Sequence, residues 1–108
     1  MKAVIVCGDS VALGRGEAPN IGWAGRLKND FEIKGTHHCL FNLSCPGDTS
    51  TDLLKRFETE AKARVKYKRP GDEFIIMIAI GLNDTKFVDP FKKPQTSLLK
   101  FKTNIAKL

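Results

Sequence analysis

Residues 74–80 form an uninterrupted apolar run, Phe-Ile-Ile-Met-Ile-Ala-Ile, which ends at Gly81. A strand inside a parallel sheet is buried on both faces, so its sequence is continuously apolar rather than alternating. With seven residues, the run is far shorter than the roughly 20 that a membrane-spanning helix needs. The run therefore predicts a central strand of a parallel sheet, and we expect no membrane span.

Two further segments predict strands of the same kind. Lys2–Cys7 is short, rich in β-branched residues and followed by glycine, which is typical of a strand buried on both faces. His38–Ser44 is a second apolar segment, and the turn-forming sequence Cys45-Pro46-Gly47-Asp48 ends it. Each of the three strands is thus expected to lead into a polar loop.

Three other segments carry apolar residues at helical spacing. Thr49 lies three residues before Asp52, which is a capping-box pattern at the start of the middle helix, and Arg69-Pro70-Gly71 ends that helix. Segment 8–22 is expected to be a loop without regular structure, and segment 82–94 is expected to be a long loop. The apolar helical positions are Trp23, Leu27 and Phe31 in the first segment, Leu54, Phe57, Ala61 and Val65 in the second, and Leu98, Phe101, Ile105 and Leu108 in the third.

The alternation of strand and helix predicts a single α/β domain over residues 1–108, with a parallel sheet and right-handed crossovers. In such sheets, ligands bind beyond the carboxyl ends of the strands. The loops that follow the three strands are therefore the expected place of the functional residues.

Composition limits the classes of function. The chain has 18 Lys and Arg residues against 12 Asp and Glu residues, and the net charge of +6 comes from the second half. A basic half can attract nucleic acid, but its cations are not interleaved with aromatic residues, so nucleic acid is not the favoured partner. Three cysteines without a CxxC pair indicate neither a disulfide framework nor a zinc site, and no metal or organic cofactor is expected. Met1 and Lys2 lead into only five apolar residues, too few for a signal peptide, so we expect a cytoplasmic protein.

The strand-end loops hold residues suited to attack on a carbonyl group. Ser10 follows the first strand and carries a hydroxyl that can act as a nucleophile. Gly47 follows the second strand, and its backbone N–H is not shielded by a side chain. Asn83 follows the third strand, and its carboxamide can donate a hydrogen bond to the same point. With the N–H of Ser10, these two donors would stabilise an oxyanion.

Each of these residues also has a purely structural interpretation. Ser10 can cap a helical turn, and Gly47 can serve the Pro-Gly turn through a positive φ angle. Trp23 is expected in the core more than in a substrate cleft. The neighbouring carboxylates are expected to orient loops, turns and helix caps rather than to act in catalysis; they are Asp9, Asp48 and Asp84.

The three strand-end segments resemble those of a known family, the SGNH or GDSL-type hydrolases. Gly8-Asp9-Ser10-Val11 is similar to the serine block, with valine where leucine is more usual. Residues 42–49, Asn-Leu-Ser-Cys-Pro-Gly-Asp-Thr, are similar to the glycine block, and Gly81-Leu82-Asn83-Asp84 to the asparagine block. The resemblance implies a flavodoxin-like three-layer α/β/α sandwich. It also implies that Ser10 attacks an ester while the Ser10 and Gly47 amides and the Asn83 side chain form the oxyanion hole.

The family's fourth block, an Asp-x-x-His that supplies the general base and the residue that orients it, has no counterpart in the 108 residues. General-base assistance typically contributes roughly 10²- to 10⁴-fold, so the chain alone is expected to be at best a weak esterase. His37 and His38 precede the second strand, and at about 3.3 Å per residue they lie roughly 20 Å from the expected cleft. We do not expect either histidine to replace the base.

These observations favour a serine ester hydrolase domain that lacks its C-terminal part. Its substrate would be a small-molecule ester, such as a short acyl, lipid or acetylated-sugar ester. In the strand order 2-1-3 the third strand lies at an edge, where its apolar sequence invites pairing, so we expect a missing segment or another subunit to cover it. Two alternatives stay open: a non-catalytic remnant that binds a ligand or partner, and a basic nucleic-acid-binding α/β module.

Overall fold

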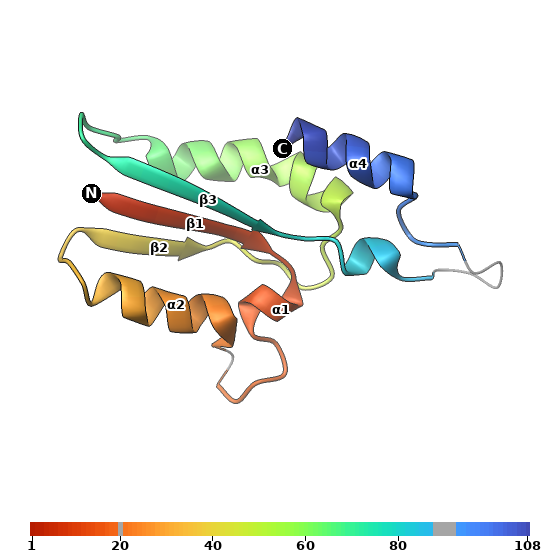
Figure 1. The fold of residues 1–108 in the computed structure, drawn as a ribbon, viewed down its shortest axis with the longest axis horizontal. Coiled ribbons are helices and arrows are strands. Elements are labelled where there is room, and N and C mark those ends of the chain that lie inside the picture. Colours follow the sequence, from red (N-terminus) through yellow and green to blue (C-terminus); the bar gives the residue numbers. More distant parts are fainter. Residues whose placement is uncertain (20, 88–92) are drawn as a thin grey trace.

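The computed structural model describes residues 1–19, 21–87 and 93–108, and it contains one parallel sheet between two layers of helices (Figure 1). The predicted three-layer α/β/α architecture is therefore confirmed. The elements in chain order are β1 (Lys2–Gly8), α1 (Ser10–Leu13), α2 (Gly22–Glu32), β2 (His38–Asn42), α3 (Ser50–Val65), β3 (Glu73–Ala79), the 3-10 helix η1 (Asn83–Thr85) and α4 (Leu98–Lys107).

The strand order is β2-β1-β3, as predicted, so β1 is the central strand. β3 contains the apolar run that by itself predicts a central strand, but it lies at the edge of the sheet that the structure describes. β1 pairs in parallel with β2 on one side and with β3 on the other. Its side chains alternate between the two faces, with Val4 and Val6 on one and Ile5 and Cys7 on the other. All four are at most 5% exposed because helices cover both faces.

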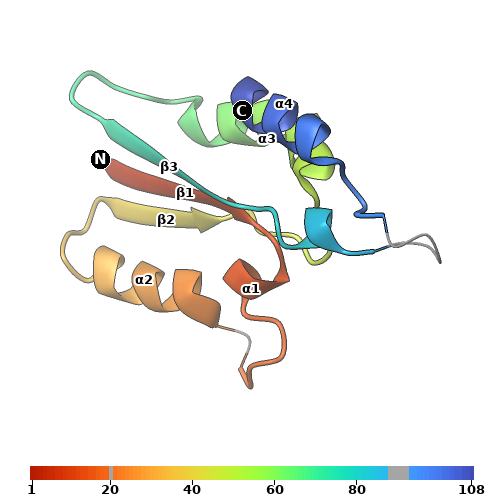
Figure 2. The same ribbon diagram turned by 45° about the vertical axis from the view of Figure 1, so that its right-hand side comes forward.

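Each face of the sheet has its own hydrophobic core. Figure 2 shows α1 and α2 on one side of the sheet and α3 and α4 on the other. The predicted helical stripe of α2 packs against the first core, whose members are Val4, Val6, Ala12, Ala24 and Leu40, with Trp23, Leu27 and Phe31 packed on them. The second core consists of Ile5, Cys7, Leu43 and Leu53, with Phe41, Phe57, Val65, Ile80 and Leu108 packed on it.

Helix α3 begins with the predicted capping box. The Thr49 hydroxyl accepts a hydrogen bond from Asp52 N, and the Asp52 carboxylate accepts one from Thr49 N at 3.0 Å. The hydrogen bond from the Thr49 backbone, followed by that from its hydroxyl, lowers the pKa of Asp52. Two of the orphan N–H groups at this helix end are therefore satisfied locally.

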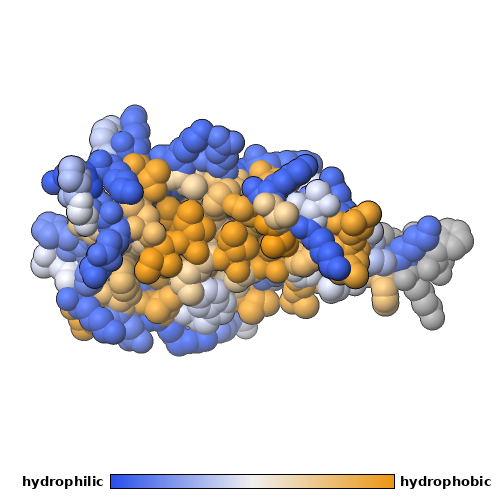
Figure 3. Space-filling model, turned by 45° about the horizontal axis from the view of Figure 1, so that its top comes forward, coloured by the Kyte–Doolittle hydropathy of each residue, from blue (hydrophilic) through white to orange (hydrophobic). Residues whose placement is uncertain are grey.

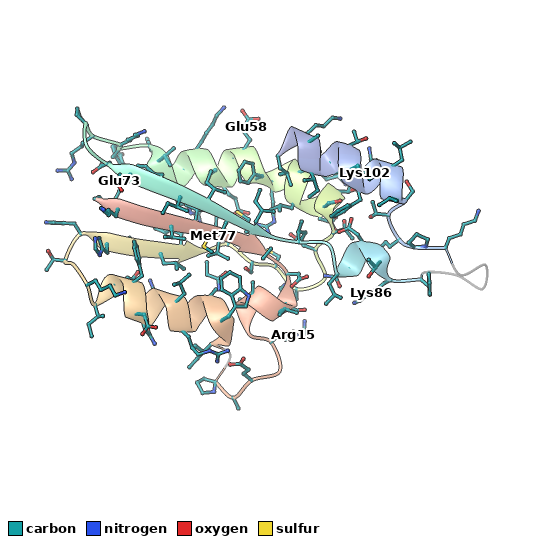
Figure 4. The ribbon with its side chains drawn as sticks, viewed as in Figure 1. Arg15, Glu58, Glu73, Met77, Lys86 and Lys102 are labelled. Carbon is teal, nitrogen blue, oxygen red and sulfur yellow. The ribbon has the colours of Figure 1, made fainter. Side chains whose placement is uncertain are left out.

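The two outer strands, β2 and β3, differ in what contacts their unpaired edges. At the edge of β2, the N–H of Leu40 donates to the Glu32 carboxylate at 2.9 Å, and its carbonyl accepts from Lys28 Nζ at 3.1 Å. The side chains of Ile75, Ile76, Met77 and Ile78 on β3 are 36–55% exposed. Figure 3 shows a band of apolar surface on this protein, and Figure 4 labels Met77 on β3.

Two predicted loops contain short helices, which corrects the expectation that segment 8–22 lacks regular structure. Helix α1 forms there because Asp9 caps it and Gly14, with φ 86°, closes it. Segment 82–94 contains η1 and an isolated antiparallel bridge between Phe87 and Pro94. Residues 20 and 88–92, which belong to these predicted loops, lie outside the described residues.

β2 ends at Asn42, two residues before the predicted end at Ser44. The Asn42 side chain accepts a hydrogen bond from Ser44 N at 3.2 Å, which draws the chain out of the strand. None of the helices in the described ranges is long and apolar enough to cross a membrane.

Candidate active site

The ends of the three strands come together at one edge of the sheet. Gly8 lies beside Ala79 in the β1–β3 register, and Cys45 N donates to Gly8 O at 3.0 Å. A Cβ on Gly8 would lie 2.8 Å from the Ala12 Cβ and 2.9 Å from the Ala79 carbonyl oxygen, so only glycine fits here. As a result, α1, the loop after β2 and η1 all lie at the same end of the molecule (Figure 1).

Ser10 is the first residue of α1 and is half-buried. The buried Asp9 before it caps the helix, and its Oδ1 accepts from Val11 N at 2.9 Å. This confirms the predicted acceptor role of Asp9 and shows that Asp9, not Ser10, provides the cap. The helix is also tied to β2, because Asn42 Nδ2 donates to Ala12 O at 3.3 Å.

Gly47 is an exposed residue of the turn after β2. Its φ is 81°, a left-handed conformation that favours glycine, while a Cβ there would meet no atom within 4 Å. The predicted role of Gly47 in the turn is therefore confirmed. Within the part of the chain that the structure describes, the N–H groups of Gly47 and Ser10 donate to no protein acceptor.

Asn83 begins η1 and is only 3% exposed. Its Nδ2 donates to the carbonyl oxygen of Asp48 at 2.9 Å, which places the carboxamide next to the residue that follows Gly47. A carboxamide nitrogen carries two protons, so one donor remains for a ligand. The structure thus brings the third strand-end loop onto the second. Across residues 1–19, 21–87 and 93–108, no hydrogen bond joins Ser10 to Gly47 or Asn83.

The two neighbouring aspartates have structural partners. Asp48 accepts from Arg56 Nε at 2.8 Å. Asp84 accepts from the N–H of Ser50, the first residue of α3, at 2.9 Å and from its hydroxyl at 2.7 Å. The predicted cap role of Asp84 is confirmed, although the helix it caps lies 34 residues away in the sequence. Sequence spacing alone gives no signal for such a contact.

The two histidines lie at the other end of the sheet. His38 begins β2, pairs in register with Lys2 and stacks on the Phe31 ring with centroids 4.8 Å apart. His37 precedes it and is exposed. The prediction that the histidines lie at the wrong end of β2 to serve as the base is confirmed. No group of three His, Cys, Asp or Glu side chains that could hold a metal ion occurs among the described residues.

A hollow of about 330 Å³ lies between α1 and the end of β3, and neither Ser10 nor Asn83 is among its lining residues. Asp9 and Val11, which flank the serine, and Leu82, which precedes the asparagine, line it. Trp23 lines the hollow as well, and its packing on the first core confirms the expected core role. Arg15, after α1, and Lys86, after η1, lie at the same end of the molecule (Figure 4).

The fold is similar to those of several solved structures. The structure of AlinE4, described as a SGNH-hydrolase family esterase, matches with a TM-score of 0.71 and 18% identity, over 98% of this chain and 50% of that one. The psychrotrophic esterase EstA from Pseudoalteromonas sp. matches with a TM-score of 0.69 and 21% identity, over 97% and 50%. TesA matches with a TM-score of 0.69 and 24% identity, over 97% and 51%. The chain thus spans about half the length of these structures.

No curated protein matches the chain. The model of the GDSL-like lipase/acylhydrolase family matches residues 6–108, which include all three strand-end loops. This match confirms the resemblance seen in the sequence. The chain therefore belongs to the GDSL-like lipase/acylhydrolase family.

Proposed function

We propose that this chain supplies the nucleophile and the oxyanion hole of a serine ester hydrolase. The observation that carries the proposal is the hydrogen bond from Asn83 Nδ2 to the Asp48 carbonyl, 2.9 Å long, at the end of the sheet where α1 presents Ser10. It holds a carboxamide donor beside Gly47, whose N–H has no acceptor within the described ranges. Two such donors suit an oxygen that gains negative charge.

In the proposed reaction, Ser10 Oγ forms a bond to the ester carbonyl carbon, and the carbonyl π electrons move to the oxygen. The Ser10 and Gly47 amides and the Asn83 carboxamide stabilise this oxyanion. Collapse of the adduct breaks the bond to the alcohol oxygen, which leaves with the proton taken from the serine. Water then hydrolyses the acyl-serine and restores the hydroxyl. The substrate is an ester of a short acyl group, a lipid or an acetylated sugar.

The general base comes from outside these 108 residues, because both histidines lie at the opposite end of the sheet. A histidine from an Asp-x-x-His block on a missing segment would take the serine proton. The DNA downstream of the Leu108 codon tests this directly. An in-frame Asp-x-x-His supports the source of the base, and a stop codon with no companion polypeptide contradicts it.

We further propose that the same missing segment, or another subunit, adds a strand to β3. The edge of β2 is occupied by Glu32 and Lys28, whereas the faces of β3 leave four large apolar side chains exposed. Exposed apolar edge strands pair readily with other chains. Gel filtration with mass spectrometry tests this assignment: a compact 12.0 kDa monomer without a companion peptide would contradict it.

The nucleophile is tested with a fluorophosphonate, whose activated P–F bond allows slow reaction without the missing base. Ser10 Oγ forms a bond to phosphorus, fluoride leaves, and the hydroxyl proton passes to buffer. We expect intact-mass analysis to find one adduct on Ser10, lost in Ser10→Ala and retained in the control Ser97→Ala. Adduct formation that survives Ser10→Ala contradicts the proposal. A nucleic-acid-binding module would instead show salt-sensitive DNA or RNA binding that survives the same substitution.

A further inference from the structure

Two consecutive side chains of η1 hold the two ends of one short segment. Asn83 donates to the carbonyl of Asp48 at 2.9 Å, and Asp84 accepts from both the N–H and the hydroxyl of Ser50. Asn83 and Asp84 are each 3% exposed. The segment 48–50 lies directly after Gly47, so the contacts that hold this segment to η1 also set the distance between the Gly47 amide and Asn83.

We propose that Asp84 is a positioning residue, which sets the Asn83 carboxamide and the Gly47 amide at a fixed separation from each other. This inference rests on the proposed function, in which both groups donate to the oxyanion. Asp84 itself touches neither the reacting carbonyl nor Ser10. Its three hydrogen bonds with Ser50, two to the backbone N–H and one to the hydroxyl, act through the segment that carries the donor.

A second layer of contacts restrains the Asp84 carboxylate. Asn104, on α4, is fully buried, and its Nδ2 donates to Ser50 Oγ at 3.0 Å and to Thr51 Oγ1 at 2.9 Å. Ser50 Oγ therefore accepts from Asn104 and has its own proton to donate to Asp84. The backbone of Asp84 is held as well, because its carbonyl accepts from Thr96 N at 3.0 Å.

The charge of Asp84 suits this position. Its carboxylate lies against the first residue of α3, where the unsatisfied N–H groups of a long helix favour a negative charge. A neutral amide of the same shape would place NH₂ donors or a weaker acceptor against Ser50. The segment 48–50 would then lose its fixed distance from η1, and a displacement of about 1 Å in a catalytic group can lower a rate by roughly 10²-fold.

The experiment compares Asp84→Asn with Asp52→Asn in the full 108-residue chain. Both substitutions neutralise a carboxylate at the start of α3, but Asp52 ties Thr49 to the first turn of that helix, and among the described residues no hydrogen bond joins Asp52 to η1. The concentration dependence of fluorophosphonate labelling at Ser10 separates the maximal rate from reagent binding. We expect Asp84→Asn to lower the maximal rate at least about tenfold, with the half-saturating concentration unchanged, and Asp52→Asn to stay within about twofold.

A second measurement does not depend on reactivity. In ¹⁵N-labelled chain, the Nδ2 proton of Asn83 that is bonded to Asp48 should exchange slowly. Asp84→Asn should speed its exchange, while Asp52→Asn should not. Equal behaviour of the two variants in both measurements would overturn the positioning role. Failure of the unsubstituted chain to label at Ser10 would instead overturn the proposed function. If Asp84→Asn does not fold, Ser50→Ala removes one of the carboxylate's donors and should give a smaller loss of the same kind; an unchanged rate in Ser50→Ala then counts against the inference.

Discussion

The two outer strands of this sheet differ in their hydrogen bonds and in the exposure of their side chains. At β2, the Leu40 backbone is hydrogen-bonded to Glu32 and Lys28 of α2, and no side chain of the strand is classed as exposed. At β3, four consecutive large apolar side chains are exposed, on both faces of the sheet. Charged groups at a strand edge prevent further pairing, whereas an open apolar edge promotes it. β2 therefore has the features of a permanent edge, and β3 has those of an interior strand.

The contrast cannot be explained by composition, because β3 is more apolar than β2. The difference in side-chain exposure depends on which strand a helix covers. Leu40 and Ile75 flank the same residue, Val4, on the same face of the sheet, yet only Leu40 has a helix above it. The first core is therefore complete between β1 and β2 and open towards β3.

The largest expected effect comes from truncating the two neighbours of Val4. Leu40→Ala should lower the free energy of unfolding by about 2–5 kcal/mol, because it leaves a cavity in a closed core. Ile75→Ala should cost about 1 kcal/mol or less, because that side chain is 55% exposed. Urea denaturation measures both. Equal decreases in the free energy of unfolding would mean that Ile75 is as well buried as Leu40.

A smaller effect is expected from placing a charge on the open strand. In concentrated solution the chain should self-associate through β3, and Ile76→Lys should weaken this association because a charge opposes strand pairing. Ile105→Lys is the matched control, since Ile105 is similarly exposed but lies on α4. Sedimentation velocity distinguishes the variants. If the two substitutions weaken self-association equally, the association comes from nonspecific contacts between apolar surfaces and not from the edge of β3.

The smallest effect concerns the closed edge of β2. The hydrogen bonds from Lys28 and then from Leu40 N lower the pKa of Glu32, so its contribution to stability is present above the unfolded pKa of about 4.3 and is lost as the pH falls through the folded value. Glu32→Gln should therefore lower the denaturation midpoint at pH 7 and have no effect at strongly acidic pH.

Glu58→Gln provides the control for this measurement, because Glu58 also forms an i,i+4 pair, with Lys62 and in the reverse order (Figure 4). Among the described residues, no strand N–H donates to Glu58, in contrast to Glu32. Its effect at pH 7 should be smaller than that of Glu32→Gln. A difference between Glu32→Gln and the unsubstituted chain that persists at strongly acidic pH would contradict the role of the ionised carboxylate.

Most of the architecture could be predicted from the sequence because local patterns determine it. The three strands, the three longer helices and the Thr49–Asp52 box depend on residues close together in the chain, and all are confirmed. The apolar stripe of α2 is confirmed as well, but that of α4 is wrong in part, because Leu98 is 67% and Ile105 40% exposed, and in α3 Leu53 rather than Leu54 is fully buried. Helix α1 was missed because it has only four residues between two glycines, so its formation depends on the Asp9 cap more than on an apolar stripe.

The site was predictable only at the level of which loops take part. Strand ends in a parallel sheet meet at one edge, and this places Ser10, Gly47 and Asn83 in three neighbouring loops. The contacts of Asp84 with Ser50 and of Asn104 with Ser50 join residues 34 and 54 positions apart. No periodicity encodes such pairs, because they arise only when α3, η1 and α4 pack together.

The crowding around Gly8 has a consequence for how this protein can vary. Even a single methyl group at this position would collide with the backbone of β3 and with a side chain of α1. Either the strand or the helix would have to move to make room for it. Random substitution at residue 8 should therefore be almost uniformly harmful, whereas the apolar positions of β3 should accept many exchanges in this isolated chain. In a saturation library that is scored for folded protein, we expect Gly8 to be among the positions that tolerate the fewest substitutions.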